Sequence, residues 1–130
     1  MKTYSGMINE LKPNQVFVFG SNGAGAHFGG AAATAHRKFG AIIGQSEGFQ
    51  GQSYGIDTMD GLEVFAEQAS HFIKFAEDHP ELEFLLTDIG CGIAGYSLEE
   101  IAPLFKGIEK LTNIQVSEQF NSACNNLGDK

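Results

Sequence analysis

Two glycine-rich stretches carry the side chains best suited to chemistry. The first, 20–30, contains Asn22 and His27, and the second, 88–96, begins with Asp88 and contains Cys91. Each stretch follows a short apolar run typical of a buried strand and precedes a segment expected to be helical. In α/β proteins a strand, a glycine-rich turn and a helix in this order place backbone N–H groups around a phosphate. The pattern therefore predicts an anion site built from main chain.

Each of the four side chains has two interpretations. Asn22 is a candidate ligand contact and a candidate turn stabiliser, because asparagine tolerates left-handed backbone. His27 has the chemistry of a general base, and a histidine that only fixes its own loop is the alternative. Asp88 is a candidate base or hydroxyl ligand, or a loop-ordering acceptor. Cys91, near an expected helix N-terminus, is either a nucleophile or a small packing residue.

The familiar phosphate and metal motifs are absent. A dinucleotide fingerprint needs Gly-x-Gly-x-x-Gly after the first strand, but Phe28 stands at the third glycine position. No Gly-Lys-Ser/Thr sequence marks a P-loop, and the histidines and cysteines do not have the spacing of zinc ligands. We therefore expect no metal and no cofactor.

Composition limits the classes of protein and partner. The 130 residues fit one domain, and 42% hydrophobic residues can form a real core. A net charge of −8 argues against a nucleic-acid or anionic-membrane binder, which needs a basic face. No apolar run has the length of a membrane span, the N-terminus lacks a signal-peptide core, and Cys91 and Cys124 form no CxxC pair. We expect a cytoplasmic protein.

Strands and helices are expected to alternate, which predicts an α/β sheet with helices on both faces. The expected strands are 15–19, 53–58, 83–87 and 113–116. The expected helices are about 29–38, 62–79, and one long helix capped by Ser97 and Glu100 with a core stripe of Ile101, Leu104, Phe105 and Ile108. We predict that 1–14 is a polar lead-in, 44–52 a loop, 15–117 the domain core and 118–130 a loose tail.

Both glycine-rich loops resemble those of macro domains, the ADP-ribose-binding α/β modules. In the second loop, Gly92, Ile93, Gly95 and Tyr96 match the Ser-Thr-Gly-Ile-Phe-Gly-Tyr motif in position, and a Glu-Glu helix start follows. In the first, 20–22 is similar to the Ala-Ala-Asn end of the macro signature and 29–31 to its Gly-Gly-Gly-Val helix start. The resemblance covers about 15–117. It is closer still to small bacterial and phage proteins with Gly-Ser-Asn, Gly-Gln-x-Glu-Gly and Gly-Cys-Gly-Ile-Ala-Gly motifs.

The resemblance implies a single macro-like three-layer α/β/α fold with a mixed, mostly parallel sheet. It also implies binding of ADP-ribose or a related nucleotide diphosphate-sugar between the loops, with Asn22 on the distal ribose, 92–96 around the diphosphate, and Tyr96 against a ribose. The implied ligand-binding residues are Gly20, Ser21, Asn22, Gly29, Gly30, Gly90, Cys91, Gly92, Ile93, Ala94, Gly95 and Tyr96. It assigns no residue to the adenine base.

Two extensions remain open. One is hydrolysis of an ADP-ribosyl or ADP-ribose phosphate linkage, with Asn22 orienting water or ribose and His27 or Asp88 transferring the proton. The other is a non-enzymatic module on the same scaffold, whose acidic surface engages a protein partner. In the first case the partner is a small nucleotide, and neither case involves nucleic acid or a membrane.

Overall fold

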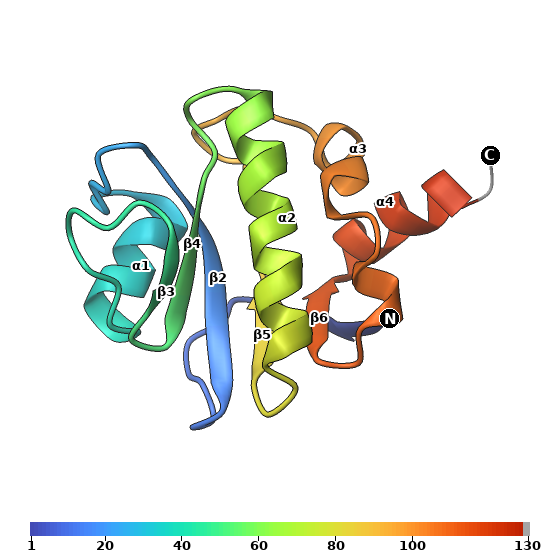
Figure 1. The fold of residues 1–130 in the computed structure, drawn as a ribbon, viewed down its shortest axis with the longest axis horizontal. Coiled ribbons are helices and arrows are strands. Elements are labelled where there is room, and N and C mark those ends of the chain that lie inside the picture. Colours follow the sequence, from blue (N-terminus) through green and yellow to red (C-terminus); the bar gives the residue numbers. More distant parts are fainter. Residues whose placement is uncertain (129–130) are drawn as a thin grey trace.

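The computed structural model describes residues 1–128 and shows one six-stranded sheet in the order β1-β6-β5-β2-β4-β3 (Figure 1). The strands are β1 (Lys2–Tyr4), β2 (Gln15–Ser21), β3 (Gly48–Gln50), β4 (Ser53–Asp57), β5 (Glu83–Leu86) and β6 (Ile114–Ser117). The helices are α1 (Gly30–Lys38), α2 (Leu62–Asp78), α3 (Leu98–Ile101) and α4 (Glu118–Gly128). All strand pairs are parallel except β3 with β4. The expected α/β fold with a mixed, mostly parallel sheet is confirmed.

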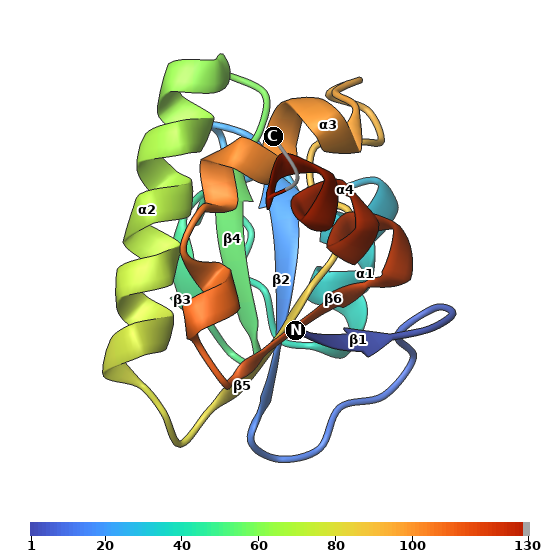
Figure 2. The same cartoon turned by 90° about the vertical axis from the view of Figure 1, so that its right-hand side faces the viewer.

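The central strand β2 is buried on both faces. Its side chains alternate in direction, as the pleat requires: Val16 and Val18 pack with α2 and the segments after it, and Phe17 and Phe19 pack with α1. The sheet consequently lies between α1 on one face and α2 on the other, an arrangement visible in both views (Figures 1 and 2). The strand predicted from the apolar run at 15–19 is therefore confirmed as the centre of the sheet, which is the middle of the three layers.

Two strands were not expected. Within 1–14, predicted as a polar lead-in, β1 pairs in parallel with β6, and within 44–52, predicted as a loop, β3 pairs with β4. Both are three-residue strands at the sheet edges; β1 has no buried residue, and β3 has one. Short edge strands show no apolar alternation, so periodicity does not detect them.

The predicted long helix after Ser97 is wrong. The Ser97–Glu100 capping box is present as predicted, but α3 ends after one turn and continues as 3₁₀ segments, Ala102–Phe105 and Ile108–Lys110. Pro103 lacks the N–H group that would continue the α-helical hydrogen bonds, and Gly107 adopts φ +108° between the two 3₁₀ segments. The apolar stripe still reaches the core despite this break.

The predicted loose tail is also wrong, because α4 covers 118–128. Phe120 is fully buried, with its ring centroid 5.8 Å from that of Phe105. The Ser117 hydroxyl accepts the N–H of Phe120 at 3.1 Å and so caps the helix. One buried aromatic and one serine cap are too weak a pattern to predict a helix, and 129–130 lie outside the described residues.

Within residues 1–128, no helix combines the length and the apolar character needed to cross a bilayer.

Truncating the buried aromatic of α4 tests its docking. Phe120→Ala is expected to lower the free energy of unfolding by about 3–5 kcal/mol in urea denaturation, because a large cavity opens against Phe105. Gln119, the exposed neighbour of Phe120, provides the control. Gln119→Ala is expected to change the free energy of unfolding by less than about 0.5 kcal/mol. Equal stability of both variants would contradict a docked helix.

Candidate functional site

The two glycine-rich loops meet at the edge of the sheet where parallel strands β2, β4 and β5 end. A crevice of about 430 Å³ lies between them. Its lining combines the first loop and the start of α1 (Gly20, Ser21, Asn22, Ala26, Gly29, Gly30, Ala31, Ala32), the β4–α2 connection (Thr58, Met59), and the second loop (Thr87, Asp88, Ile89, Gly90, Gly92, Ile93, Ala94). Crevices at this edge are the usual ligand sites of open α/β sheets.

The polar side chains of the first loop are already hydrogen-bonded within the protein. Asn22 Oδ1 accepts the N–H of Ala26 at 2.9 Å, and its Nδ2 donates to the Ala26 carbonyl at 3.2 Å. The Ser21 hydroxyl donates to the carbonyl of Ser46. Asn22 thus acts as the turn stabiliser that the sequence left open, while it also lines the crevice. In this loop the groups left for a ligand are mainly backbone.

Helix α1 begins at the crevice without a side-chain cap. Its N-cap is Gly29, and within the described residues no side chain accepts an N–H group of its first turn. The last turn carries His36, Arg37 and Lys38, which complement the helix dipole at the opposite end. The first N–H groups of a helix have no intrahelical acceptor, so this end offers donors and partial positive charge to an anion.

The second loop approaches α1 through Ile93. A Cβ on Gly29 would lie 3.5 Å from Ile93 Cδ1, so the two loops are in contact at this point. Gly90 has φ +82°, and a Cβ there would lie 2.7 Å from Cε2 of Phe65 on α2. Glycine is therefore required at position 90 for the loop to pass over the helix.

Three residues expected to bind ligand, Cys91, Gly95 and Tyr96, do not line the crevice. The Tyr96 ring instead packs 6.0 Å from that of Phe65, so it faces the core rather than a ribose. The N–H groups of all three are used within the loop: Cys91 donates to the Asp88 carbonyl, Gly95 to Gly92 and Tyr96 to Gly90. The sequence placed these three residues in the second loop correctly, but it could not predict which way the Tyr96 ring points.

His27 is buried away from the crevice. It is 1% exposed, its Nε2 lies 3.1 Å from the Gln45 carbonyl, and its ring stands edge-on to Phe19 at 5.1 Å. Its Nδ1 is enclosed without a hydrogen-bond partner in the described part of the chain. The catalytic role expected for His27 does not suit this position, because a ligand in the crevice cannot reach either ring nitrogen.

Asp88 stands between the crevice and a second cavity. Its Oδ1 accepts the Ser117 hydroxyl at 2.5 Å, which ties it to the end of β6. The second cavity, of about 540 Å³, is lined by Tyr4, Ser5, Gly6, Asp88, Ser117, Glu118, Gln119 and Ser122. Burial, with a smaller contribution from the Asp88 charge, raises the pKa of Tyr4 to about 12. Sequence reasoning missed this cavity because it rests on β1 and α4, which were not expected.

Cys91 lacks the environment of a catalytic nucleophile. Burial raises the pKa of its thiol, and the charges of Asp88, Glu99 and Glu100 raise it further. A raised pKa reduces the thiolate fraction at neutral pH. The structure thus favours packing, the second interpretation of Cys91. Within residues 1–128, no three His, Cys, Asp or Glu side chains gather as a metal site requires.

Comparison of the chain with protein-family models, with curated proteins and with solved structures found no match in any of the three.

The alkylation rate of Cys91 tests its electrostatic environment. In a Cys124→Ser background, iodoacetamide is expected to react with Cys91 more slowly at neutral pH than with an unstructured cysteine peptide. The rate should keep rising through the ordinary thiol pKa, because the raised pKa keeps the thiol protonated. A rate that levels off below about pH 8.5 would mean an activated thiol.

Proposed function

We propose that this protein binds ADP-ribose or a related nucleotide diphosphate-sugar in the crevice between its two glycine-rich loops. The observation that carries the proposal is that both loops and the uncapped start of α1 line one cavity. The resemblance of the same loops to those of macro domains supports this ligand class.

The diphosphate is expected to lie against the main chain of 29–30 and 92–94. Among the described residues, Asp88 is the one ionisable side chain in the crevice lining, so no cation there neutralises phosphate. Converging N–H dipoles can do so without lysine or arginine. Because the carboxylate of Asp88 repels phosphate, the diphosphate should occupy the α1 side of the crevice.

The second cavity extends the site for the uncharged parts of the ligand. It shares Asp88 with the crevice and offers hydroxyl, amide and carboxylate groups, including those of Ser5 and Gln119. Such groups suit the hydroxyls of a ribose and the polar edge of a base. Each cavity falls in the range of about 300–1,000 Å³ typical of small-molecule sites.

Replacing Gly92 tests the site. The affinity of each variant for ADP-ribose is measured by isothermal titration calorimetry. A Cβ at Gly92 meets no atom within 4 Å, so the backbone accepts a side chain there. Gly92→Glu is expected to weaken binding by more than tenfold, about 1.4 kcal/mol, because it adds a negative charge beside the diphosphate. Gly92→Gln has nearly the same shape without the charge and serves as the matched control.

Much weaker binding by the glutamate variant than by the glutamine variant supports an anion held in the crevice. Equal affinities of the two variants would place the diphosphate elsewhere. Absence of heat with ADP-ribose and other nucleotides for the native chain would reject the proposal.

Hydrolysis of an ADP-ribosyl or ADP-ribose phosphate linkage is a second candidate function. The observation that favours it is the Asp88 carboxylate, which is held by Ser117 and open to both cavities. In this position Asp88 is suited to accept a proton from an attacking water. The sequence left two candidates for the proton transfer, His27 and Asp88. Because His27 is buried, we assign the proton transfer to Asp88 alone.

Replacing the Asp88 carboxylate tests this activity. Asp88→Asn keeps an oxygen for Ser117 but cannot accept a proton, so turnover of an ADP-ribosylated protein should fall by about 10²–10⁴-fold while ADP-ribose still binds. Glu99→Gln removes an exposed acid from the following helix and should leave turnover unchanged. Full activity of the Asp88 variant would exclude Asp88 as the base.

A protein-interaction module is the remaining candidate. Phe28 in the first loop and Ile93 in the second are about four-fifths exposed, 79% and 80%. Large apolar side chains this exposed are typical of contact surfaces when they gather. A chain that binds no nucleotide in the calorimetric experiment would favour this function.

A further inference from the structure

Two aspartates flank the segment that forms the third wall of the crevice. Asp57 ends β4 and Asp60 precedes α2, while Thr58 and Met59 between them line the crevice. The Asp57 residue is 3% exposed, whereas Asp60 is exposed. We call the segment 57–60 the wall. Its position in the crevice depends on the contacts of the Asp57 and Asp60 carboxyl groups.

Asp57 is fixed by two hydrogen bonds. Its Oδ1 accepts the N–H of Met59 at 2.9 Å, and its own N–H donates to Gln68 Oε1 on α2 at 2.7 Å. The Asp60 carboxyl group lies beside it over Gly23 and contributes to the raised pKa of Asp57. Two ionised carboxylates repel each other and can only accept hydrogen bonds, so neighbouring carboxyl groups attract each other only when one proton lies between them.

The pair also reaches the first glycine-rich loop. A Cβ on Gly23 would lie 2.5 Å from Asp60 Oδ2 and 3.7 Å from Asp57 Oδ2. Both carboxyl groups therefore lie over Gly23, one residue after Asn22 in the crevice lining. Any side chain at position 23 would displace Asp60, so the glycine makes this approach possible.

We propose that Asp57 and Asp60 share one proton and form a pH-sensitive latch, which holds the 57–60 wall against the first loop. When the proton is lost, two adjacent negative charges repel and the wall moves away from Gly23. Its effect on ADP-ribose rests on the proposed function: an open wall and an added negative charge both disfavour the diphosphate.

Within residues 1–128, no lysine, arginine or histidine contributes to the pKa of Asp57. The groups on the neighbouring elements are Ser21 on β2, Gly23 in the first loop, and Gln68 and the exposed Glu63 on α2. Burial raises the pKa of Asp57 most, and the neighbouring carboxyl group of Asp60 raises it further, against the lowering effect of the Met59 and Asp60 N–H groups. The balance of these effects favours retention of the shared proton.

The sign of the pH dependence follows from this direction. A raised pKa means that the folded protein binds the proton more tightly than the unfolded chain does. The stabilisation is fully present below the ordinary aspartate value of 3.8 and is lost as the pH rises through the raised pKa of Asp57. The latch is thus closed at pH values below the raised pKa of Asp57 and open at pH values above it.

Amide hydrogen exchange of Met59, followed by NMR between about pH 4 and 8, tests the latch without any ligand. In the native chain the protection factor of this N–H should fall by about tenfold or more as the pH rises through the pKa of the pair. Asp57→Asn keeps the acceptor for Met59 and donates an amide hydrogen to Asp60 without a shared proton. Its protection factor should be independent of pH.

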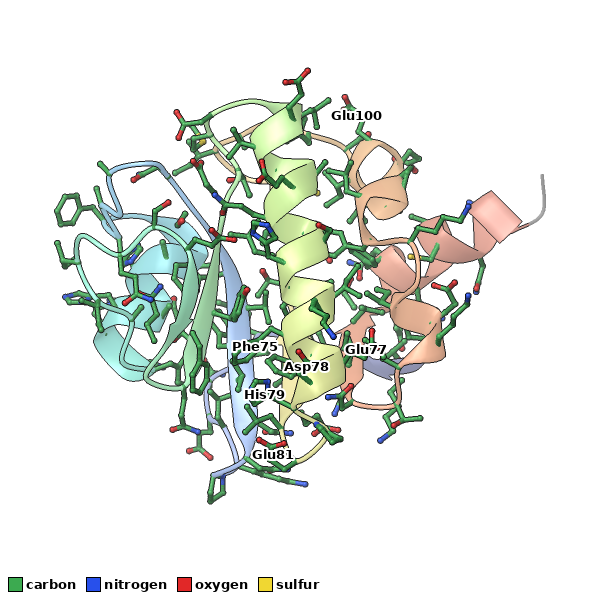
Figure 3. All side chains as sticks on the ribbon, viewed as in Figure 1. Phe75, Glu77, Asp78, His79, Glu81 and Glu100 are labelled. Atoms are coloured by element: carbon green, nitrogen blue, oxygen red, sulfur yellow. The ribbon has the colours of Figure 1, made fainter. Side chains whose placement is uncertain are left out.

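Two further variants complete the experiment. Asp60→Asn makes the same replacement at the exposed partner and should also abolish the pH dependence, which keeps the test decisive if Asp57→Asn does not fold. Glu81→Gln removes one acid beyond the C-terminal end of α2 and should behave as the native chain (Figure 3). A native protection factor that does not change with pH, or a pH dependence retained in Asp60→Asn, would overturn the latch.

Titrations with ADP-ribose over the same pH range separate the two proposals. Affinity should fall with rising pH in the native chain and stay constant in the asparagine variants. If ADP-ribose does not bind while Met59 protection follows the predicted pH dependence, the latch stands and the proposed function fails. Binding that keeps the native pH dependence in both asparagine variants would overturn the latch alone.

Discussion

The parallel pairing of β2 with β4 and β5 is the constraint on which the candidate site depends. Ser21 is paired with Asp57, and Val18 with Leu86, so the chain leaves three adjacent strands at the same sheet edge. The two glycine-rich loops and the 57–60 wall begin there and therefore face one another. A shift of one residue in the β2 register would exchange Phe19 and Val18 between the two cores and move every lining residue of the first loop.

Hydrogen bonds from residues 44–46 hold the first loop in its conformation. The Gly44 N–H donates to the Gly25 carbonyl, His27 contacts the Gln45 carbonyl, and the Ser21 hydroxyl donates to Ser46. These bonds use the polar side chains of the loop and leave its backbone, with the start of α1, at the crevice. Because a preorganised backbone does not lose side-chain entropy on binding, such a site can hold an anion with few flexible groups.

The sequence predicted the elements that a local pattern of residues marks. Apolar runs marked β2 and β5, glycines marked both loops, and Ser97 with Glu100 marked the start of α3. The direction of a loop side chain has no such signal: His27 and Tyr96 lie near the expected ligand in sequence yet pack inward because Phe19 and Phe65 offer them apolar contacts. The second cavity needed β1 beside β6, a pairing across more than a hundred residues that no local pattern encodes.

The net charge of −8 does not by itself decide whether such a site can hold an anion. At physiological ionic strength the field of distant acids is largely screened beyond about 8 Å, so the nearby groups decide the energy of a bound phosphate. Inside the crevice those groups are N–H dipoles on the α1 side and the single carboxylate of Asp88 toward the second cavity. A ligand charged at one end and rich in hydroxyls at the other would be held in one orientation by this asymmetry. The reversed ligand would place phosphate against Asp88 and lose the dipoles of α1, so we expect this one carboxylate, and not the net charge of the protein, to set the orientation of a bound ligand.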